Sequence, residues 1–162
     1  MRPFSDSELR SSLVNVTVRE RAQLTAPPDL ADRRWDRLDF FGWRDPRIPA
    51  LGYVVVELDD EPVGVLLKQA ERNPRMQAQC SWCEDVQLPN PVVFFGAKRA
   101  GRAGRNGDTI GTLVCAHFEC SANVRKRPPT PYIGFDVEAA RQRRIDLLRE
   151  HVASFVRDVR NS

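Results

Sequence analysis

Apolar residues at helical spacing open this chain. Two capping-box patterns, Ser5 with Glu8 and Thr17 with Glu20, predict N-terminal helices within residues 1–28. The buried stripe of the first helix is expected to comprise Leu9, Leu13 and Val16.

The same spacing returns at the other end of the chain. Residues 136–160 are predicted to form one long helix, with Asp136 as its cap and Glu138 in its first turn. Residues at three- and four-residue steps are expected to share one buried face: Ile145, Leu148, Val152, Phe155 and Val159.

A run of β-branched residues in the first half of the chain predicts a hairpin over residues 50–70. Its two strands, 52–57 and 63–68, flank a turn made of acidic residues and proline. The apolar run is nearly continuous, which indicates burial on both faces or a central place in a small sheet. Two further strands are predicted at 91–96 and 108–114.

Aromatic residues crowd the segment 29–49, which also contains Gly42 and two prolines, Pro46 and Pro49. Because glycine and proline interrupt helical periodicity, this segment is expected to be a compact, ordered loop. A core plug is a better interpretation than a ligand platform for the clustered aromatics Trp35, Phe40, Phe41 and Trp43.

The connection at residues 98–107 carries four positive charges, three glycines and no acidic residue. It is therefore predicted to be a flexible, exposed hairpin tip. Two interpretations stay open: a solvated turn, or a contact loop for a phosphate backbone or an acidic protein surface.

All four cysteines of the chain fall into two close pairs, Cys80 with Cys83 and Cys115 with Cys120. A two-residue gap lets one tight turn aim both sulfurs at a single ion about 2.3 Å away. The four-residue gap of the second pair needs a wider turn or the start of a helix. The spacing predicts one tetrahedral zinc site held by four thiolates.

Three other uses of the cysteines compete with zinc. Two disulfides would need an oxidising compartment, but residues 1–8 contain no apolar segment that could act as a secretory signal. A redox dithiol would explain the first pair and leave the second unexplained. Inert buried cysteines would not be expected to gather into two pairs.

One histidine, His117, lies between the ligands of the second pair and could replace Cys120. Four thiolates already complete a tetrahedral shell, so His117 is expected to lie next to the ligands or at the surface. A shell closed by four protein ligands has no open position for water, which predicts a structural metal. The sequence also lacks a paired nucleophile and base, so no enzyme is expected.

With 162 residues the chain can bury a substantial core, and a single domain over residues 1–162 is expected. Lys and Arg outnumber Asp and Glu by 25 to 22, a net charge of +3 that does not by itself indicate nucleic acid. No apolar run is long enough to span a membrane, so the protein is expected to be soluble and cytoplasmic. The predicted class is α+β: a small antiparallel sheet with N-terminal helices, a treble-clef zinc finger at residues 78–127 and the long C-terminal helix.

Several segments together resemble the FBP domain, the treble-clef zinc-binding domain of the FusB-type proteins that bind translation elongation factor G. The resemblance covers most of the chain and includes residues 38–46, the hairpin and both cysteine pairs. Its more specific parts are the cysteine spacing and the segment Cys-Ser-Ala-Asn-Val-Arg at residues 120–125. The resemblance implies that zinc is the cofactor and that its ligands are Cys80, Cys83, Cys115 and Cys120.

The resemblance also implies a module that docks on elongation factor G and helps to release it from the ribosome, which protects translation from fusidic acid. Partner contacts in such proteins lie on the zinc face and include aromatic and basic side chains. The corresponding candidates are Trp82, Arg102, Arg105 and Tyr132. An aromatic anchor beside arginines suits an acidic protein partner, and it also suits single-stranded RNA.

In one respect the chain departs from the FusB type, in which a separate helical domain precedes the zinc-bearing part. A chain of 162 residues is too short to hold that domain as well, so drug resistance and a housekeeping role in translation both stay open. The predicted function is binding of elongation factor G. The alternative is an RNA- or ribosome-binding zinc protein that does not depend on that factor, and neither a membrane nor a small-molecule substrate is expected.

Overall fold

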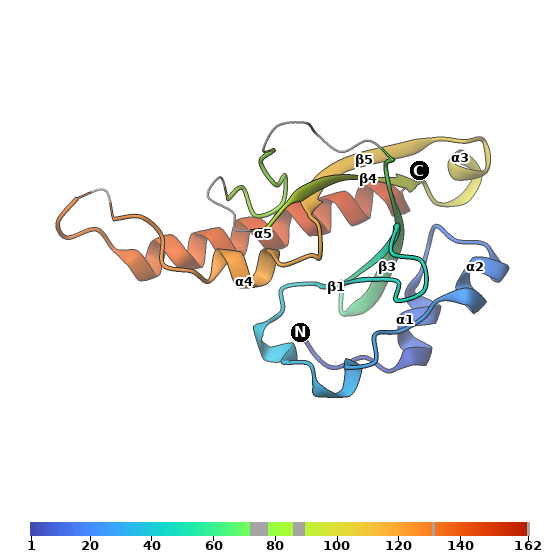
Figure 1. Ribbon diagram of the computed structural model, residues 1–162, viewed down its shortest axis with the longest axis horizontal. Helices are drawn as coiled ribbons and strands as arrows, with labels where there is room; N and C mark the ends of the chain where they lie inside the picture. Colours follow the sequence, from blue (N-terminus) through green and yellow to red (C-terminus); the bar gives the residue numbers. More distant parts are fainter. Residues whose placement is uncertain (72–77, 86–89, 131, 162) are drawn as a thin grey trace.

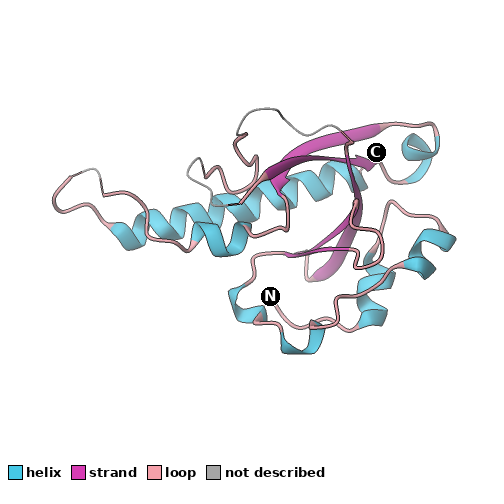
Figure 2. Cartoon of the chain, viewed as in Figure 1, coloured by secondary structure: helices cyan, strands magenta, loops and turns pink. Residues whose placement is uncertain are grey.

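The computed structural model describes residues 1–71, 78–85, 90–130 and 132–161. In this part of the chain, one antiparallel sheet of order β1-β2-β3-β4-β5 has helices on its two faces (Figures 1 and 2). The strands are β1 (Phe41–Arg44), β2 (Leu51–Leu58), β3 (Glu61–Gln69), β4 (Val92–Lys98) and β5 (Thr109–Cys115). The helices are α1 (Asp6–Ser12), α2 (Val18–Gln23), α3 (Gly101–Arg105), α4 (Cys120–Val124) and α5 (Val137–Arg160), with 3-10 turns η1 (Leu30–Asp32) and η2 (Trp35–Arg37). The α+β prediction is confirmed, and the single domain stays a prediction.

Both predicted capping boxes start the N-terminal helices. The Ser5 hydroxyl accepts from the Glu8 amide, and the Glu8 carboxylate accepts from the Ser5 amide at 2.8 Å. The latter bond is the main reason why the pKa of Glu8 is lowered to about 2. Thr17 and Glu20 repeat the arrangement at α2.

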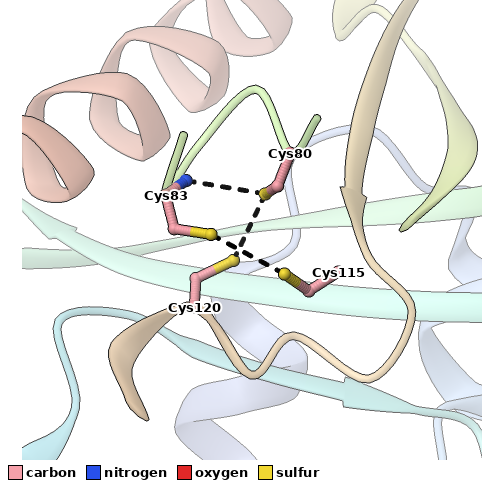
Figure 3. A group of neighbouring side chains, drawn as sticks. All are labelled: Cys80, Cys83, Cys115 and Cys120. Atoms are coloured by element: carbon pink, nitrogen blue, oxygen red, sulfur yellow. Dashed lines mark hydrogen bonds between the residues drawn. The ribbon is translucent and has the colours of Figure 1, made fainter. Parts of the chain in front are cut away.

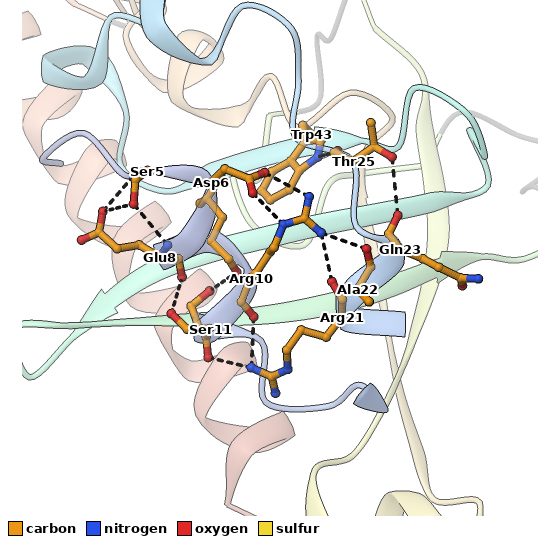
Figure 4. Close-up of polar contacts among 12 residues, drawn as sticks. Ser5, Asp6, Glu8, Arg10, Ser11, Arg21, Ala22, Gln23, Thr25 and Trp43 are labelled. Atoms are coloured by element: carbon orange, nitrogen blue, oxygen red, sulfur yellow. Dashed lines mark hydrogen bonds and ion pairs between the residues drawn. The ribbon is translucent and has the colours of Figure 1, made fainter. Parts of the chain in front are cut away.

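Two arginines tie α1 to α2 (Figure 4). Arg10 donates to the Ala22 carbonyl at 3.0 Å, and Arg21 donates in the other direction to the Ser11 carbonyl at 2.9 Å. Because short helices leave carbonyls unpaired at their C-terminal ends, these guanidinium groups supply the missing donors.

The predicted hairpin is present, with a tighter turn than expected. Asp59 and Asp60 form the turn, both with positive φ, 54° and 66°, which matches the twist of a two-residue hairpin. Glu61 and Pro62 already belong to β3, where Pro62 lies opposite Glu57.

Strand β2 is buried on both faces, as its continuous apolar run predicted. Val54 and Val56 belong to the core that holds α5 and the cysteines, here called the zinc-side core. Tyr53 and Val55 belong to the core that holds α1 and the aromatic segment, here called the N-terminal core. The strand is therefore a wall shared by two cores.

The aromatic segment is a core plug, as predicted, but it is not a loop throughout. Trp35, Phe40, Phe41 and Trp43 are all buried, and β1 lies at the edge of the sheet beside β2. Phe41 and Trp43 alternate with Gly42 in the two-residue period of a strand. The glycine and the nearby prolines obscured this period in the sequence. Gly42 is needed because a Cβ there would lie 2.6 Å from the Cβ of Phe118.

Within the described residues, strands β3 and β4 pair at two positions, Lys68 with Gly96 and Gln69 with Phe95. Beyond these pairs, the Asn15 side chain bridges the strands: it donates to the carbonyls of Leu66 and Lys98 at 3.0 and 2.9 Å. Its oxygen accepts from the Leu66 amide at 2.8 Å. One carboxamide thus replaces backbone pairs where the two strands separate.

The basic connection at residues 98–107 contains the short helix α3, which corrects the prediction of a flexible loop. Gly104 permits this turn, because a Cβ there would lie 1.7 Å from the Arg99 carbonyl oxygen. The Ala100 amide donates to the Val159 carbonyl at 2.8 Å, which fixes the tip to the end of α5.

Helix α5 confirms the predicted C-terminal helix. The Asp136 carboxylate caps it by accepting from the Ala139 amide at 2.9 Å, and all five residues of the predicted face are buried. Among the described residues, no helix has both the length and the apolar character needed to cross a membrane.

A pair of adjacent leucines on α5 allows a matched test of this packing. We expect Leu148→Ala to lower the free energy of unfolding by about 2–5 kcal/mol, because Leu148 is fully buried and its loss leaves a cavity. Leu147→Ala is the control, since that side chain is 38% exposed, and it should change stability by less than about 1 kcal/mol. Urea unfolding measures both, and equal effects would contradict the packing described here.

Candidate metal centre

Four cysteine sulfurs meet in the zinc-side core, although they come from distant parts of the chain (Figure 3). All four lie within 4.8 Å of one another. The Cys80–Cys120 and Cys83–Cys115 sulfur distances are both 3.7 Å. A tetrahedral zinc ion with bonds of about 2.3 Å has ligand sulfurs roughly 3.8 Å apart. The four side chains therefore fit a zinc ion.

The first pair sits in a tight turn held to the sheet. The Cys83 amide points at the Cys80 sulfur at 3.5 Å, and the Glu84 amide donates to the Cys80 carbonyl at 2.9 Å. Glu84 has a positive φ of 53°, which lets the chain leave the turn sharply. The Ser81 amide donates to the Leu113 carbonyl at 2.8 Å, so the turn is anchored on the edge of β5.

The second pair spans the end of β5 and the start of α4. Cys115 is the last residue of β5, and Cys120 is the first residue of α4. Between them Phe118 has a positive φ of 61°, and its amide donates to the Cys115 carbonyl at 2.9 Å. The wider gap thus ends at a helix start, which is one of the two geometries the sequence allowed.

Contacts among the sulfurs shift their acidities in opposite directions. Hydrogen bonds from Cys115 and Cys120 lower the pKa of Cys80, whereas contacts with Cys115 and Cys80, together with burial, raise the pKa of Cys120. Without a cation, therefore, the four thiols cannot all ionise together. A bound Zn²⁺ supplies the positive charge that allows four thiolates in one place.

The arrangement of the sulfurs favours one shared metal ion over the other uses of the cysteines. All four are free thiols in the structure. Each 3.7 Å contact joins a sulfur of the first pair to a sulfur of the second, as in Cys80 with Cys120. A group that interleaves both pairs fits one shared ion better than a separate redox dithiol. His117 is exposed and is not part of the cluster.

A buried carboxylate links this site to the first half of the chain. The Asp39 side chain is fully buried and accepts two bonds from Arg125, together with one from Arg149 of α5 at 2.9 Å. The Asp39 amide also donates to the Ser121 hydroxyl at 3.0 Å. Sequence reasoning missed this network, because Asp39 lies far along the chain from its partners.

The predicted anchor Trp82 is not exposed, which corrects the interpretation of its role. Its side chain is 2% exposed and lies among Phe40, Phe118 and Phe155, with ring centroids 5.4, 6.4 and 5.6 Å away. Its carbonyl contacts the His151 Nδ1 atom at 3.1 Å, so the turn is also held to α5. Trp82 is thus part of the zinc-side core.

The other predicted partner contacts are exposed but do not form one surface with the metal site. Arg102 and Arg105 lie on α3, at the far end of the β4–β5 hairpin from Cys115. The length of β5 places them roughly 20 Å away along the strand. Tyr132 lies in the loop before α5 and is 65% exposed.

That loop also contains an apolar residue that sequence reasoning missed. Ile133 is fully exposed, next to Tyr132, whose ring makes an edge contact with Phe135 at 5.5 Å. Figure 1 shows the described residues between α4 and α5 (126–130 and 132–135) projecting beyond the sheet. The signal in the sequence was the prolines at positions 128, 129 and 131, which interrupt a helix and are typical of exposed loops.

Comparisons with known proteins agree with this geometry. The family model described as FBP C-terminal treble-clef zinc-finger matches residues 8–159. Among solved structures, that of the fusidic acid resistance protein FusC matches 76% of this chain and 53% of its own chain, with a TM-score of 0.56 and 19% identity. This chain therefore spans about half the length of that protein and shares its fold. No match was found among curated proteins.

Zinc content provides a direct test of the ligand assignment. We expect Cys120→Ser to lose most of the bound zinc and to unfold at a lower temperature, because metal binding contributes to folding free energy. His117→Ala should keep a full complement of one zinc per chain. Elemental analysis and thermal unfolding measure both. Zinc retained by Cys120→Ser and lost by His117→Ala would show that the histidine is the fourth ligand instead.

Proposed function

Because this chain belongs to the FBP C-terminal treble-clef zinc-finger family, we propose that it is a zinc-stabilised binding module whose partner is translation elongation factor G. In this proposal, binding promotes release of the factor from the ribosome. Support comes from the fold shared with a fusidic acid resistance protein and from the four cysteines placed to hold the family's zinc.

The projecting loop between α4 and α5 carries the proposal furthest. Its tip presents Tyr132 and Ile133, which are 65% exposed and fully exposed. Lys126 and Arg127, also exposed, precede the tip. An aromatic and an aliphatic side chain beside cations suit an apolar cleft with an acidic rim on a protein partner.

The site chemistry supports a binding role rather than an enzymatic one. Four cysteine ligands fill a tetrahedral zinc shell, so no position stays open for a reacting water. The zinc would act by holding the turn at residues 80–83 and α4 in place. We propose the cytoplasm, where the factor and the ribosome meet, as the place of action.

One feature favours a second candidate, the binding of RNA or of the ribosome itself. Arg102 and Arg105 are exposed on α3, in a tip that contains no acidic residue between positions 98 and 107. Arginines spaced along an exposed turn suit a phosphate backbone. This surface lies away from the Tyr132 loop, so the two candidates can be separated by mutation.

A binding titration of the zinc-loaded protein against purified elongation factor G tests the first candidate. We expect Tyr132→Ala and Ile133→Asp each to weaken binding about tenfold or more, as for apolar anchors at interfaces. Val18→Asp is the control, because Val18 is an equally apolar residue, 86% exposed, on α2. Trp82→Ala is not suitable here, since Trp82 lies in the core.

The outcomes separate the two candidates. Binding that is lost with the Tyr132 and Ile133 variants but kept by Val18→Asp supports the factor as partner. No binding of the wild-type protein at any salt concentration refutes it. Steep salt-dependent binding to ribosomal RNA, lost when Arg102 and Arg105 are replaced by Ala, would then establish the second candidate.

A further inference from the structure

The segment Cys-Ser-Ala-Asn-Val-Arg at residues 120–125 has two polar faces. Ser121 and Arg125, four residues apart, both contact Asp39. Cys120 and Asn123, three residues apart, both face the sulfur cluster. Because residues at these spacings share a helix face, α4 joins the metal site on one side and the N-terminal half on the other.

The Asn123 side chain lies against one sulfur of the site. It is 2% exposed, and its Nδ2 atom lies 3.5 Å from the Cys115 sulfur and 3.1 Å from the Asn90 Oδ1 atom. Its Oδ1 atom accepts from the Lys126 ammonium at 3.0 Å. An ammonium group can only donate, so this contact fixes the carboxamide with its NH2 group toward the sulfur.

The charge of the site gives this contact a role. Four thiolates around one Zn²⁺ leave a net charge of −2 in a buried place, where charge needs hydrogen-bond donors or cations. The Cys83 amide is one donor, to Cys80. The carboxamide of Asn123 is a second, and Lys126 on its oxygen polarises the N–H bonds further.

We propose that Asn123 is a positioning residue of the zinc site, whose amide donates a hydrogen bond to the Cys115 thiolate. The bond draws electron density from that sulfur and holds β5's last residue against α4. It thereby makes the metal harder to remove. The proposal concerns the metal site alone and does not depend on which partner the protein binds.

Cobalt substitution gives a readout that a purely structural role would not change. In Asn123→Ala, we expect the sulfur-to-cobalt charge-transfer band to move to longer wavelength, because a thiolate without its donor is more electron-rich. We also expect metal affinity, measured by chelator competition, to fall about tenfold or more, as is typical when such outer partners are lost.

Ser121→Ala is the matched control. Ser121 lies on the same helix, is 4% exposed and accepts a hydrogen bond from the Asp39 amide, which the variant loses; it has no recorded contact with a sulfur. We expect this variant to lose stability while its charge-transfer band stays in place. Identical bands in Asn123→Ala and the wild-type protein would overturn the proposal, and so would an equal shift in both variants.

A measurement on the wild-type protein keeps the proposal testable if Asn123→Ala does not fold. In protein loaded with ¹¹³Cd, a proton hydrogen-bonded to a metal-bound sulfur shows scalar coupling to the cadmium nucleus. We expect this coupling for one Asn123 side-chain amide proton and, as an internal reference, for the Cys83 backbone amide. Coupling at Cys83 without coupling at Asn123 would overturn the proposal.

Discussion

The bonding of one metal ion by four thiolates is the constraint on which the second half of this chain depends. The turn at residues 80–83 and α4 are each too short to be stable alone, since isolated short helices and turns are marginal in water. Their sulfurs meet at the separation that a tetrahedral zinc requires. Aromatic side chains, Trp82 and Phe118 among them, are buried in the same core as the four cysteines. Metal coordination and apolar packing thus stabilise the same few residues.

Asp39 carries this order into the first half of the chain. Its buried carboxylate is shared by Arg125, the residue after α4, and by Arg149 of α5. The Arg125 side chain is 22% exposed and that of Arg149 is 55% exposed. Loss of Arg125 would therefore leave the buried carboxylate less compensated, which costs more than the loss of a surface pair. The contact therefore specifies how the zinc-side core and the aromatic segment join.

Much of this arrangement could be predicted because its signals are local. The capping boxes, the hairpin and the C-terminal helix follow from spacings within a few residues, and the metal site follows from two cysteine gaps. The burial of Trp82, the strand β1 and the Asp39 network could not be predicted in this way. Each depends on residues far apart in the chain, such as Phe118 packed against Gly42. The helix α3 was missed for a different reason, because its glycines usually mark flexible turns.

Strand β2 couples the unfolding of the two cores, because it contributes side chains to both. Val54 and Val56 face one core while Tyr53 and Val55 face the other, so neither core can open without exposing one side of the same strand to water. Partial unfolding of either half therefore loses the packing of the core that opens and also exposes one apolar face of the strand, which stays folded in the other core. Loss of the metal from the zinc-side core is therefore expected to speed amide exchange in the N-terminal core as well, in residues that no sulfur contacts.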